Sequence, residues 1–224
     1  MYFWILTKNK FIMKKTILVF SLVFVFLSCK EDKAKKVETH HAKPVAVVKN
    51  DGTFKTVESQ ILWKGYKPTG SHHGSIDLKE GVLAVKDNQL VGGKFIIDMT
   101  TIKDLDMPQT DPYNKKLIDH LKSPDFFDVA KYPTAKFEIT AVRPQAENYL
   151  IEGNLTIKDI TKNITFPAMV LNKKDEITFY SDAIKIDRTD FGIKYKSKKF
   201  FGNLKDKFIN DLFDVSFKIK AKKE

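Results

Sequence analysis

The side chains that could perform covalent catalysis are few in this chain of 224 residues. Its only cysteine, Cys29, lies near the N-terminus, so the remainder of the chain has no thiol nucleophile. No serine lies in a GxSxG elbow, which would expose its hydroxyl to a histidine and an acidic partner. No glycine-rich loop joins an expected strand to a helix, which is the arrangement that binds nucleotide phosphates. The sequence therefore predicts neither an enzyme nor a nucleotide-binding protein.

The histidines are the remaining candidates for acid-base chemistry or metal binding. His72 and His73 are adjacent at the start of an expected strand, where successive side chains point to opposite faces, so they would not readily share one ion. Either one, pointing inward, could hydrogen-bond the polar end of a ligand; the alternative is a polar pair at the rim of the fold. His40 and His41 lie in a polar segment in which nothing else completes a metal site, and His120 stands alone. We therefore predict no metal site and no cofactor.

The acidic residues have neighbours that indicate structural roles. In the segment DRTDFG, the charges of Asp187, Arg188 and Asp190 are typical of a salt-bridged corner. Phe191 follows them beside Gly192, whose missing side chain lets the backbone approach closely. We therefore expect the charged residues to stabilise the fold and Phe191 to face the interior.

The elements that would position these residues are β-strands, most clearly in the second half of the chain. Apolar residues there recur at every second position, and short polar clusters interrupt the alternation at regular intervals. Such runs occupy residues 135–142, 149–158, 164–171, 177–186 and 214–221. Because the connections between them are short, consecutive strands must pair in an antiparallel meander.

Closure of this meander determines the predicted fold. A meander of about eight strands has two exposed edges, and pairing the first strand with the last removes both. We therefore predict an all-β fold, an antiparallel eight-stranded barrel, over residues 53–224. A helical insertion at about residues 111–128 interrupts the strands, because Asp111 is a good N-cap and Pro112 a good first residue. We expect it to cap one end of the barrel, whose interior is either filled or just open enough for one small ligand.

The N-terminus has the pattern of an export signal. Residues 13–28 begin with a methionine and two lysines, continue as an apolar run shorter than the roughly 20 residues that span a membrane, and precede Cys29. We interpret residues 1–28 as a signal peptide, with Met13 as the candidate true start, and Cys29 as a lipidated residue in a context that resembles a lipobox. An ordinary secretory signal followed by an incidental cysteine is the alternative. Residues 29–52 are charged and poor in large apolar groups, which predicts a flexible tether.

The basic charge of the chain indicates a membrane partner and not a nucleic acid. The formal charge is +11, and residues 1–28 hold four lysines and no acidic residue, so their removal leaves +7. Lysines cluster at residues 194–199 and 205–207, where they could meet anionic headgroups, and no aromatic-interleaved recognition motif accompanies them. The segment Lys30–Asp32 resembles the charged triplet that some Bacteroidetes-type lipoproteins carry after the cysteine. We expect an exported protein, periplasmic or on the cell surface, that is anchored to the outer membrane as a lipoprotein.

Five segments of the chain resemble the motifs of one known family, in its order. They are WKGYKPTGSHHGSIDLKEGVL (63–83), GGKFIIDMTTI (92–102), HLKSPDFFDVAKYPTAKFEIT (120–140), GNLTIKDITKNITFPA (153–168) and DRTDFGIKY (187–195). Through them the chain is identified as a member of the YceI-like family of lipid- and polyisoprenoid-binding proteins. The resemblance implies a lipocalin-like barrel that encloses a long isoprenoid tail, and it implies a homodimer, since members are often dimeric. Family membership implies a fold more firmly than a function.

Aromatic and aliphatic residues on the expected strands supply the candidate walls of that cavity. For any one of them, plain core packing explains the pattern as well as ligand contact does, but together with the resemblance they indicate a ligand-binding interior. The residues that we expect to line it are Trp63, Tyr66, Phe95, Ile97, Phe126, Phe127, Phe137, Ile151, Leu155, Phe166, Phe179, Phe191, Phe217 and Ile219. Of these, Phe126 and Phe127 belong to the helical insertion and would shape the entrance or the floor.

These observations lead to one main hypothesis and two alternatives. The main hypothesis is an exported lipoprotein that binds a polyisoprenoid or similar amphipathic lipid inside its barrel, for storage, transport or sequestration. One alternative is a lipid-modifying or redox-assisting enzyme that uses His72, His73 or His120. The other is a structural lipoprotein whose barrel is filled by its own side chains and whose surface binds another protein.

Overall fold

The computed structural model describes residues 34–45, 50–146 and 148–224. The expected signal peptide, its candidate start at Met13 and the expected lipidation site Cys29 lie outside these residues. The described residues form the strands β1 (Thr39–His41), β2 (Gly52–Lys67), β3 (Gly70–Lys86), β4 (Gln89–Asp104), β5 (Thr134–Pro144), β6 (Tyr149–Ile157), β7 (Ile160–Lys173), β8 (Glu176–Asp187) and β9 (Leu212–Lys223). They also form the helix α1 (Pro112–Lys122) and two 3-10 turns, η1 (Arg188–Phe191) and η2 (Lys205–Lys207). No helix in this part of the chain is long and apolar enough to cross a membrane.

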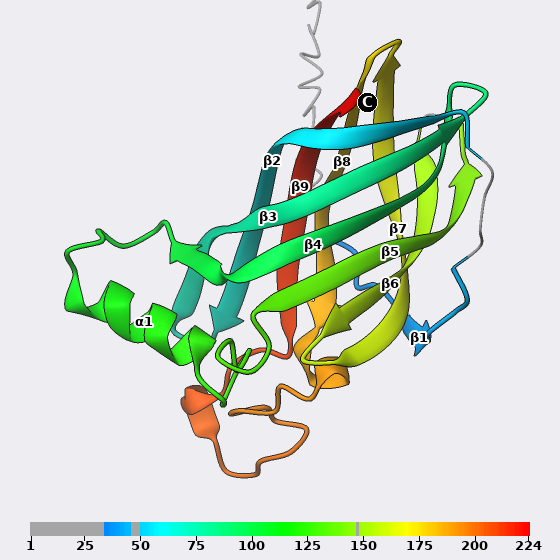
Figure 1. Ribbon diagram of the computed structural model, residues 1–224. Helices are drawn as coiled ribbons and strands as arrows, with labels where there is room; N and C mark the ends of the chain where they lie inside the picture. Colours follow the sequence, from blue (N-terminus) through cyan, green and yellow to red (C-terminus); the bar gives the residue numbers. More distant parts are fainter. Residues whose placement is uncertain (1–33, 46–49, 147) are drawn as a thin grey trace, which may run out of the picture. The chain divides into compact units, whose positions relative to one another are not determined.

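Strands β2 to β9 form one closed barrel (Figure 1). Each strand pairs in antiparallel orientation with the next along the chain, and β2 pairs with β9, which closes the sheet. The predicted eight-stranded antiparallel barrel is therefore confirmed. The register sets the interior: Phe137 on β5 lies opposite Phe95 on β4 and Leu155 on β6, and all three side chains are buried inside the barrel.

Side chains fill the end of the barrel that lies away from α1. Phe54, Leu83, Val85, Leu90 and Ile177 gather there, and none of them is more than 6% exposed. The helix α1 follows the opposite end of β4 and contacts that strand. The two ends of the barrel therefore differ, and a cavity can form only at the α1 end.

The helix α1 begins as the sequence predicts. The carboxylate of Asp111 accepts a hydrogen bond from the backbone N–H of Tyr113 at 2.8 Å, and a proline follows Asp111 as the first helical residue. The helix ends at Lys122, where the hydroxyl of Ser123 donates to the carbonyl of His120 at 2.8 Å. The residues that follow form turns, so the helical part of the insertion is shorter than the expected 111–128.

The barrel wall is open between β7 and β8, and an N-terminal segment closes it. The two strands pair only near the turn that joins them, and the rest of β8 pairs with β9 alone. Residues 35–43, which we call the N-terminal strap, fill the gap: β1 pairs with the free edge of β7, and the backbone of Lys185 on β8 bonds to both Lys35 and Val37. The predicted flexible tether over residues 29–52 is therefore wrong for the strap, because its backbone completes the ladder that β7 and β8 leave unpaired.

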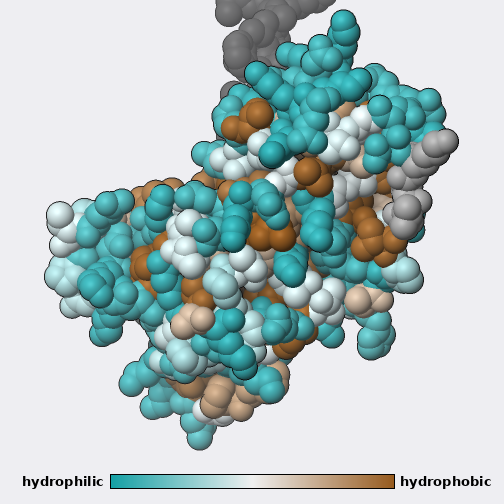
Figure 2. Space-filling view, in the orientation of Figure 1, coloured by the Kyte–Doolittle hydropathy of each residue, from teal (hydrophilic) through white to brown (hydrophobic). Residues whose placement is uncertain are grey.

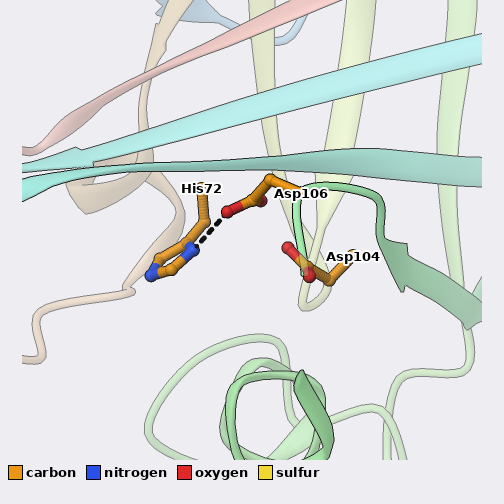
Figure 3. A group of neighbouring side chains, drawn as sticks. All are labelled: His72, Asp104 and Asp106. Carbon is orange, nitrogen blue, oxygen red and sulfur yellow. Dashed lines mark hydrogen bonds and ion pairs between the residues drawn. The ribbon is translucent and has the colours of Figure 1, made fainter. Parts of the chain in front are cut away.

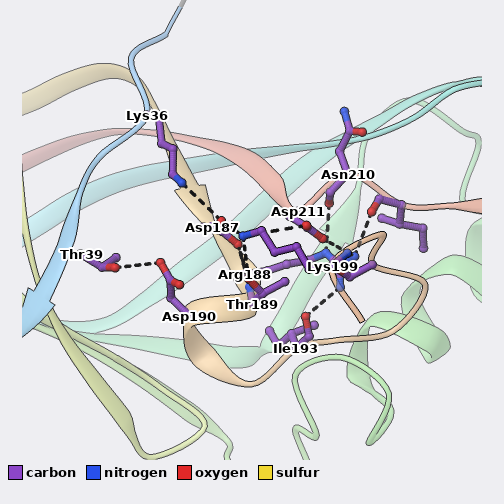
Figure 4. Close-up of polar contacts among 12 residues, drawn as sticks. Lys36, Thr39, Asp187, Arg188, Thr189, Asp190, Ile193, Lys199, Asn210 and Asp211 are labelled. Atoms are coloured by element: carbon purple, nitrogen blue, oxygen red, sulfur yellow. Dashed lines mark hydrogen bonds and ion pairs between the residues drawn. The ribbon is translucent and has the colours of Figure 1, made fainter. Parts of the chain in front are cut away.

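Polar side chains fasten the strap to the outside of the barrel. The hydroxyl of Thr39 donates to Asp190 at 2.8 Å (Figure 4). The side chain of Asn154 accepts from the backbone N–H of Lys43 at 3.0 Å and donates to the carbonyl of the same residue at 2.7 Å. The ammonium of Lys43 pairs with the buried carboxylate of Glu152, and this hydrogen bond lowers the pKa of Glu152 against the opposing effect of burial. Tertiary contacts therefore order a segment whose composition is that of a linker.

Candidate functional site

A cavity of about 220 Å³ occupies the α1 end of the barrel. Its wall consists of residues from all eight barrel strands, from α1 and the turn after it, from η1 and from the loop that precedes β9, and nearly all of them are apolar. Of the residues that we expected to line the interior, the structure places on this wall Trp63, Phe95, Ile97, Phe126, Phe127, Phe137, Leu155, Phe166, Phe179, Phe217 and Ile219. A space of this size with an almost wholly apolar lining is suited to apolar ligands.

Phenylalanine rings from five strands form a continuous cluster along the cavity wall. Ring centroids lie 5.6 Å apart for Phe137 and Phe166, 6.0 Å for Phe166 and Phe217, and 4.9 Å for Phe179 and Phe217. Phe95 stacks on Phe179 at 5.9 Å. Aromatic pairs at these separations attract one another beyond the effect of burial. The cluster therefore joins five strands through ring contacts along the cavity wall.

Three of the expected wall residues lie elsewhere. Tyr66 is three positions from Trp63, so it lies on the other face of β2, and its hydroxyl donates to Asp214 at 2.7 Å. Burial and this hydrogen bond raise the pKa of Tyr66 to about 12. Ile151 and Phe191 are completely buried in the packed core and do not border the cavity. The expectation that these three residues contact a ligand is corrected accordingly.

The turn after α1 roofs the cavity with Phe126 and Phe127. The imidazole of His120 meets the ring of Phe126 edge-on at 5.0 Å, and the guanidinium of Arg188 lies 5.7 Å from the centre of the same ring. The ammonium of Lys158 donates to the carbonyl of Phe126 at 2.8 Å. His120 therefore serves as a packing partner for the roof, and not as a residue that faces the cavity.

Among the described residues, Arg188 is the one charged side chain on the cavity wall, and its donors are bonded to groups of the fold (Figure 4). Its guanidinium donates to the carbonyls of Ile193 at 2.8 Å, Ile209 at 2.9 Å and Asn210 at 3.0 Å, and it reaches the carboxylate of Asp211 at 3.3 Å. These contacts leave at most about one of the five N–H donors of a guanidinium for any other partner. The cavity is therefore suited to an uncharged, apolar part of a ligand.

The DRTDFG motif forms an ion-paired corner, as expected, but its partners lie outside the motif (Figure 4). The carboxylate of Asp187 accepts from Lys199 at 2.6 Å and lies 3.5 Å from the ammonium of Lys36 in the N-terminal strap. Burial by itself would raise the pKa of Asp187, but the bonds from Lys199 and from Thr189 outweigh it and lower the pKa. The corner therefore joins η1 both to the strap and to the loop that precedes β9.

The adjacent histidines lie at the rim of the barrel, and neither lines the cavity. Figure 3 shows His72 beside Asp106. The Nδ1 atom of His72 is 2.9 Å from a carboxylate oxygen of Asp106, and the backbone N–H of His73 donates to the other oxygen at 2.8 Å. The two histidines therefore form the polar pair at the rim that was one of the two interpretations of the sequence, and neither lines the cavity as a contact to the polar end of a ligand would require. Neither Asp106 nor its neighbour Asp104 was expected at a site, and the only local signal is their spacing at the end of a strand.

Comparisons with known proteins identify the domain. The family model described as the YceI-like domain matches residues 34–221, a range that includes the N-terminal strap. A UPF0312 protein of Pseudomonas putida is 32% identical over 149 residues, which cover 64% of this chain and 63% of the relative. A UPF0312 protein of Pseudomonas aeruginosa is 36% identical over 80 residues, which cover 34% of this chain and 42% of the relative. The chain therefore spans less than two thirds of the length of these curated relatives.

Solved structures share the fold at low sequence identity. Burkholderia cenocepacia BcnA superposes with a TM-score of 0.57 and 20% identity, over 73% of this chain and 96% of its own. A polyisoprenoid binding domain from Saccharophagus degradans superposes with a TM-score of 0.56 and 12% identity, over 79% of this chain and 100% of its own. At such identities the likeness extends to the barrel and not to the residues of the cavity.

Proposed function

Because this chain belongs to the YceI-like family, we propose that it binds a polyisoprenoid or similar amphipathic lipid in the cavity of its barrel, and stores, carries or sequesters it without catalysis. The observation that carries the proposal is the cavity itself, whose wall is almost wholly apolar and lies at one end of the barrel. The Saccharophagus degradans domain, which has the same fold and is described as polyisoprenoid binding, supports this class of ligand.

The volume of the cavity sets how much of a lipid tail it holds. A cavity of ~150 Å³ takes up one benzene ring, so 220 Å³ accommodates roughly nine carbons, or about two prenyl units. At ~0.8 kcal/mol for each buried carbon, that length contributes about 7 kcal/mol to binding before the cost of ordering the tail. A longer tail has to displace side chains of the phenylalanine cluster or leave through the mouth.

A basic loop borders the cavity and supports a membrane as the source of the ligand. Residues 193–210 lead from η1 to β9, and the first residue, Ile193, and a residue near its end, Ile209, line the cavity. Between them lie six lysines and two exposed rings, Phe200 at 47% and Phe201 at 49%. On the face shown in Figure 2, hydrophilic residues dominate and apolar groups are scattered. Lysines near an anionic leaflet contribute ~1 kcal/mol each, and exposed rings can enter the interface.

The N-terminal strap limits the distance between the folded domain and the proposed lipid anchor. We propose that Cys29 is lipidated and holds an exported protein at the outer membrane, in the periplasm or on the cell surface. The strap begins at residue 35, so the six intervening steps along the chain span at most about 20 Å. An anchor at that position would keep the basic loop within reach of the membrane that supplies the lipid.

The cavity weighs against both alternatives to lipid binding. A lipid-modifying enzyme needs a titratable group that faces its substrate. The one charged side chain that the described residues contribute to the wall, Arg188, is occupied by four contacts. A structural lipoprotein with a filled barrel does not need the space that remains at the α1 end.

The test is to identify lipid that copurifies with the protein. The Cys29→Ser variant, which cannot carry the proposed anchor, is expressed in the native host and purified without detergent, and an organic extract is analysed by mass spectrometry. We expect one prenyl or related amphipathic lipid in near-stoichiometric amount. The double variant Phe200→Ser and Phe201→Ser, which removes only exposed rings, should carry the same lipid but take it up more slowly from anionic vesicles.

Two results would contradict the proposal. If neither protein yields a lipid, the cavity does not hold one in the cell. If only the double variant loses the lipid, the ligand lay on the loop and not inside the barrel.

A further inference from the structure

Three side chains with metal-binding atoms meet at the α1 end of the barrel, outside the cavity wall (Figure 3). His72 projects from β3, Asp104 is the last residue of β4, and Asp106 lies in the loop that leads to α1. One ligand atom from each residue lies within 4.8 Å of the other two. Segments far apart in the sequence therefore bring one imidazole and two carboxylates together.

The carboxylate of Asp104 is buried and only half satisfied. The residue is 3% exposed. One oxygen accepts hydrogen bonds from the backbone N–H of Met107 at 3.0 Å and from the side-chain amide of Asn114 on α1 at 3.2 Å. The other oxygen is also buried, and it has no hydrogen-bond partner among the described residues. A buried anion with a free lone pair is costly, so this oxygen needs a proton or a cation.

The other buried carboxylates of the described residues show what Asp104 lacks. Glu152, at 3% exposure, pairs with Lys43 and Arg143. Asp187, at 1%, pairs with Lys36 and Lys199. Asp104 has no lysine or arginine partner in this part of the chain, and its titratable neighbours are a second carboxylate and a histidine. The barrel thus compensates each buried carboxylate with positive charge except this one.

The two carboxylates lie close together, because the candidate ligand atoms of Asp104 and Asp106 are within 4.8 Å of each other. One positive species between them would relieve both groups, and in a protein interior that species is either a shared proton or a metal ion.

We propose that His72, Asp104 and Asp106 bind a divalent transition-metal cation of the Zn²⁺ class. An imidazole together with carboxylates suits Zn²⁺ and its neighbours in the series, whereas Mg²⁺ prefers an all-oxygen octahedron. The charge of a dication balances two carboxylates. The bonds from Met107 and Asn114 already orient Asp104, as hydrogen bonds to metal ligands commonly do.

A cation at this site would join three elements. It would tie β3 to the end of β4 directly, and through Asn114 it would tie both strands to α1. The same helix carries Leu121, which lines the cavity. The site is therefore suited to fixing the helix beside the mouth of the barrel, whatever ligand the barrel holds.

The test measures metal binding directly. The full chain is stripped with EDTA, dialysed and titrated with ZnCl₂ by calorimetry. The variants are made in a His40→Ala and His41→Ala background, so that these exposed histidines add no second site. We expect one Zn²⁺ per chain, no binding of MgCl₂, and a melting temperature that rises by about 5–10 °C when free Zn²⁺ is a hundred times its Kd.

Asp104→Asn keeps the size of the side chain and removes its charge, so it should weaken Zn²⁺ binding by at least about 10- to 100-fold. Asp119→Asn makes the same change on the exposed face of α1 and should bind as the parent does. If circular dichroism shows that Asp104→Asn does not fold, the His72→Gln variant replaces it in the titration, and we expect the same loss of Zn²⁺ affinity. Absence of Zn²⁺ binding at neutral pH would assign the position to a shared proton and overturn the proposal, as would equal affinity of the parent and both site variants.

Discussion

Gly65→Leu should close the cavity without disturbing the barrel. Gly65 lies on β2 two positions after Trp63, and both residues line the cavity. A Cβ atom placed on Gly65 meets no other atom within 4 Å. A leucine side chain can therefore extend into the empty space, and the variant should retain the far-UV circular dichroism and the melting temperature of the parent.

The size of the effect follows from the volume that the new side chain takes. Leucine adds four carbons to a cavity that holds roughly nine. Excluding about four ligand carbons at ~0.8 kcal/mol each removes about 3 kcal/mol of binding free energy, which raises Kd by roughly two orders of magnitude.

The assay is competition with a fluorescent farnesyl analogue, whose emission rises when it leaves water. The matched control is Gly202→Leu, because a Cβ at Gly202 also meets nothing within 4 Å but the residue lies in an exposed loop and does not line the cavity. We expect Gly202→Leu to bind as the parent does. Equal affinities for Gly65→Leu and the parent, with both folded, would refute the cavity as the binding site.

Three further changes test what holds the barrel and its strap together. Lys43→Met removes the hydrogen bond that lowers the pKa of Glu152 in the folded protein. The stability that comes from this lowered pKa is fully present above the ordinary glutamate pKa of ~4.3, and it is lost as the pH falls through the pKa of Glu152 in the folded state. Acid unfolding followed by tryptophan fluorescence should therefore begin at a higher pH, and an unchanged midpoint would show that the strap is loosely held. Arg188→Lys leaves several buried acceptors unpaired and should cost about 3–5 kcal/mol in urea unfolding, whereas a loss below about 1 kcal/mol would contradict the corner described above. Gly153→Ala places a Cβ 2.3 Å from a phenylalanine ring and should cost about 1–3 kcal/mol, while Gly92→Ala, with its nearest contact at 3.7 Å, should cost less.

The fold of this protein could be predicted from the sequence because its signals are local. Alternation with period two marks a strand wherever it occurs, and short turns between strands permit only antiparallel neighbours. The start of α1 could be predicted for the same reason, since Asp111 and Pro112 act on backbone groups within one turn of themselves. The same alternation found most of the cavity wall, because residues on one face of a strand in a closed barrel share its interior.

The errors in the predicted wall have equally definite causes. The prediction that Tyr66 lines the cavity was wrong because Tyr66 lies on the opposite face of β2 from Trp63. A count of strand positions could have shown this. Ile151 and Phe191 are apolar and buried, as predicted, but they border packed side chains and not empty space. Whether an inward side chain meets a ligand or a neighbour depends on how the barrel is filled along its length, and periodicity carries no information on that.

The sequence by itself therefore determined the strands, their antiparallel order and the apolar interior. Only the tertiary structure decided what the polar residues do. The strap has the composition of a linker, and it is ordered because β7 and β8 diverge and leave a backbone edge that residues 35–43 can pair with. Asp104, Asp106 and His72 look ordinary along the chain, and they meet because the pairing of β3 with β4 and the position of α1 bring them together. Patterning acts over a few residues, whereas contacts between distant polar groups depend on register and closure, which no short segment contains.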